Sequence, residues 1–271
     1  MPELPEVETV KNELEPHIVG KKIADITLFW EKMTKDLPPA EFFKKTVGRR
    51  VTGLSRRGKY LFFELDSGGY MVAHLKMTGS LLFDPRNFDG KYVRAVILFD
   101  NGSRLYFCDP RKFGRLWYVD DKAEIEQKLG PEPLEPGFTA GVLGERLHGR
   151  QAPIKAVLLE QPVVAGIGNM YADEALHAAG IHPTRPAASL TEMEIFRLHT
   201  AILKILRAAI VNKGASVVNY LRPGGETGTA HFEFRVAHGQ QKTCDRCGGD
   251  IKRIVVRTRG TYFCPVCQPE R

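Results

Sequence analysis

The spacing of hydrophobic residues changes along the chain and predicts a different structure for each part. In residues 3–18 apolar side chains recur every three or four positions, which predicts a helix with one buried face. From residue 21 to about residue 120 the pattern becomes short runs rich in β-branched and aromatic residues, such as 60–65, 70–75 and 93–99. The stretches 66–69 and 100–102 between these runs are typical of hairpin turns. Many short strands joined in this way predict an antiparallel β-sandwich or barrel.

Two stretches rich in glycine and proline, residues 130–137 and 222–229, interrupt the pattern and indicate domain boundaries. Between them the spacing is helical again, in segments near residues 139–147, 153–161, 169–179 and 191–212. We therefore expect an α+β multidomain protein. Residues 1–130 would form an N-terminal helix with an antiparallel β-sandwich, residues 131–224 a helical domain, and residues 225–271 a C-terminal module.

Four cysteines in the C-terminal module have the spacing of a metal site. Cys244-x2-Cys247 is followed after sixteen residues by Cys264-x2-Cys267. Four thiolates at this spacing hold one Zn²⁺ and leave no open coordination position, so the predicted zinc is structural. The residues between the two pairs favour a β-hairpin with residues 259–261 near its turn. The isolated Cys108 is expected to be a small buried apolar residue, and we assign it no function.

The chain begins Met-Pro-Glu-Leu-Pro-Glu, which offers a candidate nucleophile. Methionine before a small residue is usually removed, and Pro2 would then have a free secondary amine that can attack an electrophilic carbon and form an iminium. Glu3 and Glu6 are candidate proton carriers beside it. A structural interpretation remains open, because proline also suits the first turn of a helix.

The composition indicates a polyanionic partner and no membrane segment. The chain has 271 residues, a formal net charge of +7 and a pI near 9.1, which favours nucleic acid as the partner. No apolar run approaches the roughly 18 residues that a membrane span needs, and no secretory signal pattern is present. We therefore expect a cytoplasmic protein, in which cysteines act as metal ligands and not in disulfides.

Two loops of the β-rich part combine positively charged residues with a large apolar residue, Met77 in one loop and Phe113 in the other. Residues 74–80 read His-Leu-Lys-Met-Thr-Gly-Ser, and residues 109–115 read Asp-Pro-Arg-Lys-Phe-Gly-Arg. An apolar wedge together with an arginine can fill the gap that an extruded base leaves in a duplex. The alternative is that Met77 and Phe113 are core residues and that the cations are merely solvated.

The helical part contains the run Gly166-Ile-Gly-Asn-Met-Tyr-Ala-Asp-Glu-Ala-Leu176 between two predicted helices. A glycine-containing turn before a helix can direct backbone N–H groups at an anion. Asn169 is predicted to be the N-cap and to contact a phosphate oxygen. An ordinary helical hairpin that uses glycine for close packing is the alternative.

Together these motifs resemble the bacterial formamidopyrimidine-DNA glycosylases, the bifunctional repair enzymes for oxidised purines. The resemblance covers essentially the whole chain: the N-terminal Pro-Glu-Leu-Pro-Glu, Arg-Gly-Lys-Tyr at 57–60, the two loop motifs above, Gly-Asn-Met-Tyr at 168–171 and the four-cysteine finger. It implies a β-sandwich, a helix–two-turn–helix DNA-binding domain and a zinc finger with one structural Zn²⁺. The implied partner is damaged double-stranded DNA, bound by a monomer in the bacterial cytosol.

The resemblance also implies roles for matching residues. Pro2 would attack C1′ of the damaged nucleotide, Glu3 would assist sugar ring opening and proton transfer, and successive β- and δ-elimination would cut the strand. Met77, Arg111 and Phe113, here called the void-filling set, would occupy the gap in the duplex. Residues 225–234 would close over the everted base. The remaining implied catalytic or DNA-contacting residues are Lys59 and Arg259 on phosphates, Lys155 in recognition of oxidised guanine, Asn169 on a flanking phosphate, and His74, Glu6 and Tyr171.

Three other functions fit parts of the sequence. The sister family of endonuclease VIII type, which excises oxidised pyrimidines, shares the nucleophile but differs in the void-filling residues. A non-catalytic zinc-containing lesion sensor would explain the charge and the finger but not Pro2 and Glu3. A metal-dependent nuclease would need an open metal site, and the eight histidines form no obvious cluster. One departure from the family pattern lies before the finger, where this chain has Val236-Ala-His-Gly239.

Overall fold

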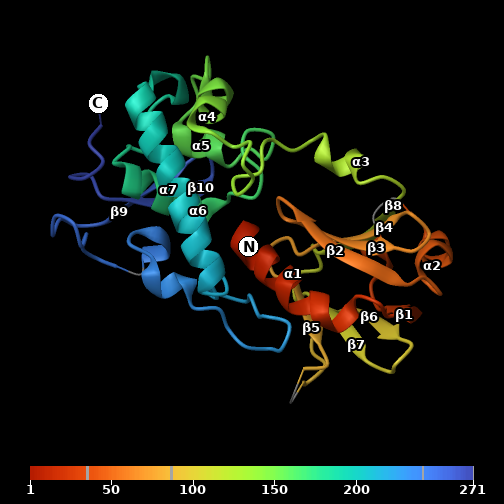
Figure 1. Cartoon of the computed structure of the whole chain (residues 1–271). Coiled ribbons are helices and arrows are strands. Elements are labelled where there is room, and N and C mark those ends of the chain that lie inside the picture. Colours follow the sequence, from red (N-terminus) through yellow and green to blue (C-terminus); the bar gives the residue numbers. More distant parts are fainter. Residues whose placement is uncertain (35–36, 86–87, 240, 271) are drawn as a thin grey trace. The chain divides into compact units, whose positions relative to one another are not determined.

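The structure is a computed structural model that describes residues 1–34, 37–85, 88–239 and 241–270 (Figure 1). The chain forms two compact units. The first comprises residues 1–127 and 213–228, and the second comprises residues 128–212 and 229–271.

The first unit contains an N-terminal helix and two four-stranded antiparallel sheets. α1 (Leu4–Ile18) is the helix that the apolar stripe predicts, and every apolar position of that stripe is buried. One sheet has the strand order β1-β6-β7-β5 and the other β2-β3-β4-β8. The strands are β1 (Ile23–Leu28), β2 (Val51–Arg57), β3 (Tyr60–Leu65), β4 (Tyr70–His74), β5 (Ser80–Phe83), β6 (Val93–Phe99), β7 (Arg104–Cys108) and β8 (Arg115–Val119).

A single hydrophobic cluster joins α1 to both sheets. It includes Val10 from α1, Phe63 from β3 and Phe107 from β7, all of them essentially inaccessible to solvent. Short helical elements complete the unit: the 3-10 helix η1 (Glu31–Thr34), α2 (Pro39–Thr46) and α3 (Ala123–Glu126). The predicted β-sandwich with an N-terminal helix is therefore confirmed.

The predicted hairpin turns lie where the sequence places them. Residues 66–69 connect β3 to β4 and residues 100–102 connect β6 to β7. Gly68 and Gly102 have φ of 89° and 83°, in the left-handed region that glycine adopts at least cost. The strand predicted over residues 70–75 ends one residue earlier, at His74.

The second unit is helical and ends in a two-stranded hairpin. Its helices are α4 (Ala140–Leu147), α5 (Ile154–Leu158), α6 (Asn169–Ala179) and α7 (Glu192–Val211), with 3-10 turns η2 (Ala187–Ser189), η3 (Ala230–Glu233) and η4 (Ala237–Gly239). Thr191 and Glu194 form a capping box that starts α7, and Gly180 in the left-handed region ends α6. The segment predicted over 153–161 is shorter as observed, because α5 ends at Leu158.

The finger hairpin consists of β9 (Lys252–Val256) and β10 (Arg259–Phe263), which pair antiparallel. Its two-residue turn is Arg257-Thr258, and both residues have positive φ, 42° and 69°. Positive φ at both central positions is typical of the tight turns that suit the twist of a hairpin. Arg259 is exposed and directly follows the turn as the first residue of β10, and Gly260 and Thr261 lie further along that strand.

The boundaries of the two units can be compared with the proline- and glycine-rich stretches. The first boundary falls between Gln127 and Lys128. Gly130 already packs inside the second unit, where its N–H donates to the Gln161 carbonyl (2.8 Å) and an added Cβ would collide with the Pro162 oxygen. Residues 213–228 belong to the first unit, so the predicted loop 225–234 has residues in both. Of the helices in the described ranges, none has the length and apolar character required to cross a membrane.

Candidate active site and nucleic-acid interface

Pro2, Glu3 and Glu6 lie together at the N-terminal end of α1. Glu3 is the N-cap, Pro5 lies in the first turn where proline is tolerated, and Glu3 and Glu6 form a capping box. The Glu3 N–H donates to Glu6 Oε2 at 2.7 Å. Pro2, Glu3 and Glu6 are all buried, whereas Met1 is about half exposed. The residue that would become the N-terminus after loss of Met1 is thus held beside two carboxylates.

Glu6 also binds a segment more than two hundred residues away. Its Oε1 accepts the N–H of Ala215 at 2.8 Å, and its carbonyl accepts the Tyr220 hydroxyl at 3.3 Å. Gly214 has φ of 76°, and an added Cβ would lie 2.9 Å from Glu6 Cγ. Residues 213–228 are thereby attached to the first turn of α1. No local pattern links Gly214 and Ala215 to Glu6, so neither was predicted as part of the site.

Lys59 and His74 lie at the ends of neighbouring strands and are both buried. Lys59 follows Gly58 in the turn between β2 and β3. His74 Nδ1 accepts the N–H of Lys76 at 2.9 Å, and the His74 ring meets the Tyr60 ring edge-on. Burial, together with the charges of Lys76 and Lys59, lowers the pKa of His74 to about 3. His74 is therefore neutral at physiological pH and offers no positive charge to a phosphate.

The void-filling set is brought together by two loops of the first unit. Met77 lies between β4 and β5, and Arg111 and Phe113 lie between β7 and β8. Arg111 Nη1 lies 3.3 Å from the Met77 sulfur, and its Cζ lies 4.8 Å from the centre of the Phe113 ring. Met77 and Phe113 are 39% and 44% exposed. The alternative that they are core residues is wrong.

Asn169 is the first residue of α6, and the predicted N-cap is wrong by one position. Gly168 is the N-cap, because its backbone is extended (φ −134°, ψ −159°) and the helical conformation begins after it. The Asn169 side chain instead donates through Nδ2 to the Gly260 carbonyl in β10, at 3.0 Å. The start of α6 is thus joined to the strand that begins with Arg259.

Lys155 lies in the interior of the second unit and is fully buried. Its Nζ donates to the Asn169 carbonyl at 2.7 Å and forms an ion pair with Asp173. The other oxygen of Asp173 accepts the N–H of Tyr262 in β10 at 3.2 Å. Burial raises the pKa of Asp173 to about 6, a value at which it is still ionised at pH 7. This network connects α5, α6 and the finger hairpin.

Two further residues of α6 attach the segment that precedes the finger. The Glu174 carboxylate accepts the N–H groups of Arg235, Val236 and Ala237 at 2.8–3.0 Å. Tyr171 is also buried, and its ring meets the Phe234 ring edge-on at 5.7 Å. The segment in which the chain departs from the family pattern therefore docks on α6 through backbone N–H groups, which do not depend on its side chains.

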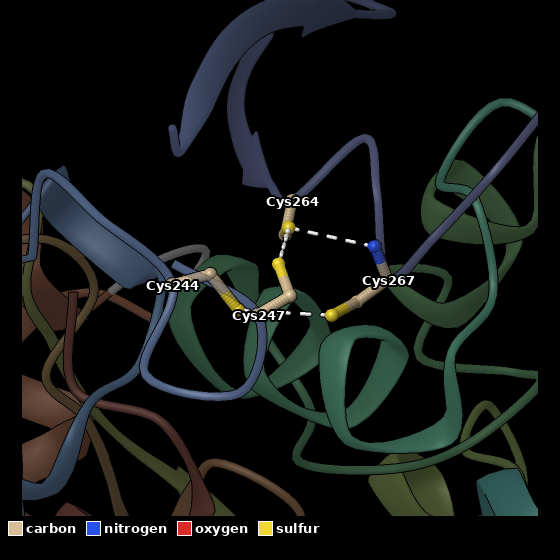
Figure 2. Close-up of side chains that lie close together, drawn as sticks. All are labelled: Cys244, Cys247, Cys264 and Cys267. Carbon is tan, nitrogen blue, oxygen red and sulfur yellow. Dashed lines mark hydrogen bonds between the residues drawn. The ribbon is translucent and has the colours of Figure 1, made fainter. Parts of the chain in front are cut away.

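The four cysteines of the finger converge on one point (Figure 2). Their sulfur atoms all lie within 4.8 Å of one another, with Cys244–Cys267 at 3.8 Å and Cys247–Cys264 at 3.4 Å. Thiolates around tetrahedral zinc, each about 2.3 Å from the metal, are about 3.8 Å apart. The donor set therefore fits one structural zinc. Outside the set, His177 Nε2 lies 3.4 Å from the Cys244 sulfur, a contact that the cysteine spacing does not predict.

The fold and these residues define a class of protein: a DNA-binding enzyme with a proline directly after Met1, a helical DNA-binding domain and a four-cysteine zinc finger. Family models agree along the chain. The formamidopyrimidine-DNA glycosylase N-terminal domain matches residues 1–116, the H2TH domain of the same enzymes matches 129–220, and the zinc finger found in FPG and IleRS matches 241–269. The chain belongs to the formamidopyrimidine-DNA glycosylase family.

Individual relatives match over nearly their whole length. The formamidopyrimidine-DNA glycosylase of Chloroflexus aurantiacus is 46% identical over 99% of this chain and 98% of its own. That of Geobacillus kaustophilus is 41% identical over 99% and 100%. Among solved structures, Lactococcus lactis Fpg in complex with DNA containing an abasic site superposes with a TM-score of 0.91 at 38% identity, covering 99% of this chain and all of that one. The Thermus thermophilus MutM (FPG) protein gives 0.90 at 38% identity, with both chains fully covered.

Proposed function

We propose that this DNA glycosylase of oxidised-purine repair uses Pro2 as its nucleophile. The observation that supports the proposal most strongly is the buried first turn of α1, in which Glu6 binds the Glu3 N–H and Pro2 lies directly before the N-cap. Loss of Met1 would convert the Pro2 nitrogen from an amide, which has no nucleophilic lone pair, into a secondary amine.

The chemistry can be followed bond by bond. The Pro2 lone pair forms a bond to C1′ while the bond from C1′ to the base breaks, and the base leaves with that electron pair and takes up a proton. The Pro2 nitrogen, now bonded to C1′, gives up its N–H proton to a base. Its freed lone pair then forms the iminium double bond to C1′ as the bond from C1′ to the ring oxygen breaks, and Glu3 gives a proton to that oxygen. The iminium acidifies C2′, so removal of a proton there expels the 3′ phosphate, and a second elimination expels the 5′ phosphate.

Residues of both units support a DNA-binding role. We assign the void-filling set to the gap that the everted nucleotide leaves, with Arg111 facing the orphaned base. Lys59, Asn169 and Arg259 are assigned to phosphates, and residues 225–234 to closure over the everted base. His74 Nδ1 accepts the Lys76 N–H, so the neutral ring carries its proton on Nε2, and we assign that N–H to a DNA phosphate.

Lys155 and Tyr171 receive indirect roles. Lys155 is fully buried and bonded to Asp173 and to the Asn169 carbonyl, so we propose that it affects recognition of oxidised guanine by positioning Asn169 and β10. Tyr171 is buried against Phe234, and we propose that it supports the segment that leads from the closing loop into the finger.

We also propose that the protein acts as a monomer in the cytoplasm. One active site per lesion requires no second subunit, and the relatives named above are bacterial. Light scattering of the free protein and of the complex with a lesion-containing duplex would measure the stoichiometry, and a 2:1 complex would contradict the monomer.

The nucleophile is tested by borohydride trapping, since borohydride reduces an iminium to a stable amine. The substrates are duplexes with 8-oxoguanine opposite cytosine or with an oxidised pyrimidine opposite its partner. A matched control has one residue added before Pro2, which blocks the amine and leaves every other residue unchanged. We expect a covalent adduct that maps to Pro2, with preference for 8-oxoguanine, and no adduct in the control.

Each alternative has its own outcome in this experiment. Preference for the oxidised pyrimidine would indicate specificity of the endonuclease VIII type. Tight binding of both duplexes without base release or adduct would indicate a lesion sensor. An adduct of equal yield in the blocked chain would contradict the assignment to Pro2.

A further inference from the structure

Asp109 is a fully buried carboxylate at the start of the loop that contains Arg111 and Phe113. One oxygen accepts the Thr78 hydroxyl and the N–H of Arg111, the latter at 3.1 Å. The other accepts the N–H groups of Phe113 and Gly114, both at 2.7 Å. The carboxylate thus has four donors and no cation among the hydrogen bonds described for it.

The backbone of Asp109 is itself fixed. Its N–H donates to the Tyr92 carbonyl at 2.8 Å, and its carbonyl accepts Arg94 Nε at 2.8 Å, so it is attached to the β6 side of the sheet. Gly114 allows the close approach, because an added Cβ would lie 2.5 Å from the Phe107 ring and 3.2 Å from the Asp109 carboxylate. The loop of residues 109–114 therefore closes around a rigid acceptor.

Thr78 extends this network to the second loop. Thr78 directly follows Met77, and Gly79 closes that loop with an N–H donated to the Leu75 carbonyl at 2.9 Å. A side chain at Gly79 would lie 2.5 Å from the same carbonyl oxygen, so the turn is tight. The hydroxyl of Thr78 on the Asp109 carboxylate consequently links the two loops, 31 residues apart in the sequence.

We propose that Asp109 is a positioning residue that, through Thr78, presets Met77, Arg111 and Phe113 as one wedge before DNA is bound. This inference rests on the proposed role of the void-filling set. Side chains that are already ordered lose less conformational freedom on binding, so insertion into the duplex is more favourable. Arg111 would then face the orphaned base in a geometry fixed by the protein and not by the DNA.

The test compares Thr78→Val, which removes only the hydroxyl, with Thr78→Ser, which retains it. Excision of 8-oxoguanine is measured under single-turnover conditions opposite cytosine and opposite adenine. In a separate duplex, the fluorescence of a 2-aminopurine placed opposite the lesion reports whether that base is stacked against protein side chains or exposed to solvent. We expect the rate constant for excision from the duplex to fall roughly tenfold in Thr78→Val, because the loss of one hydrogen bond to a charged group has an effect of this size. The ratio of the excision rate opposite cytosine to that opposite adenine should also move closer to one. Thr78→Ser should remain within about twofold of the unchanged protein.

Asp109→Asn is the stronger variant, because the new amide would direct N–H toward existing N–H donors. We expect the excision rate from the duplex to fall roughly a hundredfold in Asp109→Asn. The urea midpoint of unfolding, followed by tryptophan fluorescence, shows whether this variant is folded. If it is not, the Thr78 pair still tests the proposal. The proposal would be overturned if the ratio of excision rates opposite cytosine and adenine were unchanged in Thr78→Val. It would also be overturned if Thr78→Val and Thr78→Ser lost the same fraction of the excision rate.

A control reaction separates this proposal from the proposed function. Borohydride trapping on a single-stranded oligonucleotide with an abasic site requires Pro2 but no wedge, since there is no opposite strand. If the unchanged protein fails to trap there, the nucleophile assignment is wrong. If it traps, and the Thr78 variants show no defect on the duplex, the wedge proposal alone is wrong.

Discussion

The two units hold their functional segments by different means. In the first unit, the void-filling loops and the first turn of α1 rest on one large hydrophobic cluster that joins a helix to two sheets. In the second, the finger contributes few buried apolar residues, chiefly Val256 and Phe263. A segment of this size cannot bury enough apolar surface to fold alone, so it depends on a metal and on polar bonds.

Both units nevertheless use buried carboxylates that accept backbone N–H groups. Glu6 and Asp109 do so in the first unit, and Asp173 and Glu174 do so in the second. The difference lies in charge compensation. Asp173 is paired with the buried Lys155, whereas the hydrogen bonds described for the Asp109 carboxylate come from neutral donors. We conclude that the finger is the more sensitive of the two regions to loss of a single charge or of the metal.

This comparison can be measured because the two regions have separate probes. Both tryptophans of the chain, Trp30 and Trp117, belong to the first unit. Tryptophan fluorescence therefore follows unfolding of the first unit, and hydrogen exchange of residues 252–263 follows the finger.

Zinc removal should have the largest effect. Chelation is expected to abolish protection of the β9 and β10 amides, since zinc binding contributes on the order of 10 kcal/mol to the folding of such fingers. The tryptophan transition of the first unit should not shift. DNA binding should weaken, with a smaller salt dependence, because Arg259, which we assign to a phosphate, is then no longer held in place by the finger.

Restoring zinc serves as the control for chelation and should recover both protection and binding. Trapping on the single-stranded abasic oligonucleotide should persist without zinc, because Pro2 lies in the other unit. Amides of β9 and β10 that remain protected after verified loss of zinc would show that the polar network alone holds the finger.

Asp173→Asn should have the second largest effect. Removing one partner of a buried ion pair leaves an uncompensated charge, here on Lys155, and costs about 3–5 kcal/mol. We expect faster hydrogen exchange in residues 252–263 and faster loss of zinc to a chelator, with an unchanged tryptophan transition. Asp250→Asn is the matched control, since Asp250 pairs with Lys252 at 3.4 Å on the exposed surface of the same finger. Equal behaviour of the two variants would contradict a special role for the buried pair.

Lowering the pH should reduce the stability of the first unit, because His74 is buried there in its neutral form. Its pKa is lowered to about 3 in the folded protein from 6.5, so between these values the unfolded chain binds a proton that the folded chain does not. Stability is therefore lost as the pH falls below about 6.5, by roughly 2 kcal/mol at pH 5 from this residue alone.

The matched variant is His74→Asn, whose side-chain oxygen can accept the Lys76 N–H in place of Nδ1 and cannot titrate. Urea unfolding followed by tryptophan fluorescence gives the free energy of unfolding of each protein at pH 8 and at pH 5. The decrease in this free energy from pH 8 to pH 5 should be smaller in His74→Asn than in the unchanged protein. Equal decreases would show that His74 is not the group responsible.

How much of this could be predicted depends on whether a feature is local in sequence. The stripe of α1, the hairpin turns and the cysteine spacing each lie within a few residues, and the structure confirms them. The Asn169 N-cap failed for a local reason as well: two residues, Gly168 and Asn169, can both precede a helix, and only the backbone angles of Gly168 decide between them.

The contacts that position the site were not predictable in this way. Thr78 and Asp109 are 31 residues apart, Asp173 and Tyr262 are 89 apart, and Glu6 and Ala215 are 209 apart. A hydrogen bond between such residues leaves no periodicity or spacing in the sequence, and one partner is often a backbone N–H with no side-chain signature. The resemblance to a family supplied roles for individual residues, but it did not supply these connections.

Glu13→Gln should have the smallest effect and tests how residues 213–228 are held to α1. Arg222 donates to both oxygens of Glu13 at 2.6–3.1 Å, but the pair is about a quarter exposed. Water and salt screen such a pair, so we expect a loss of about 0.5–1 kcal/mol that shrinks further in about 1 M salt. Glu6→Gln, which alters a fully buried acceptor of two N–H groups, should cost about 1–3 kcal/mol regardless of salt. Hydrogen exchange of residues 213–228 compares the two variants directly. If Glu13→Gln releases the segment more than Glu6→Gln does, the surface ion pair and not the buried carboxylate attaches residues 213–228 to α1.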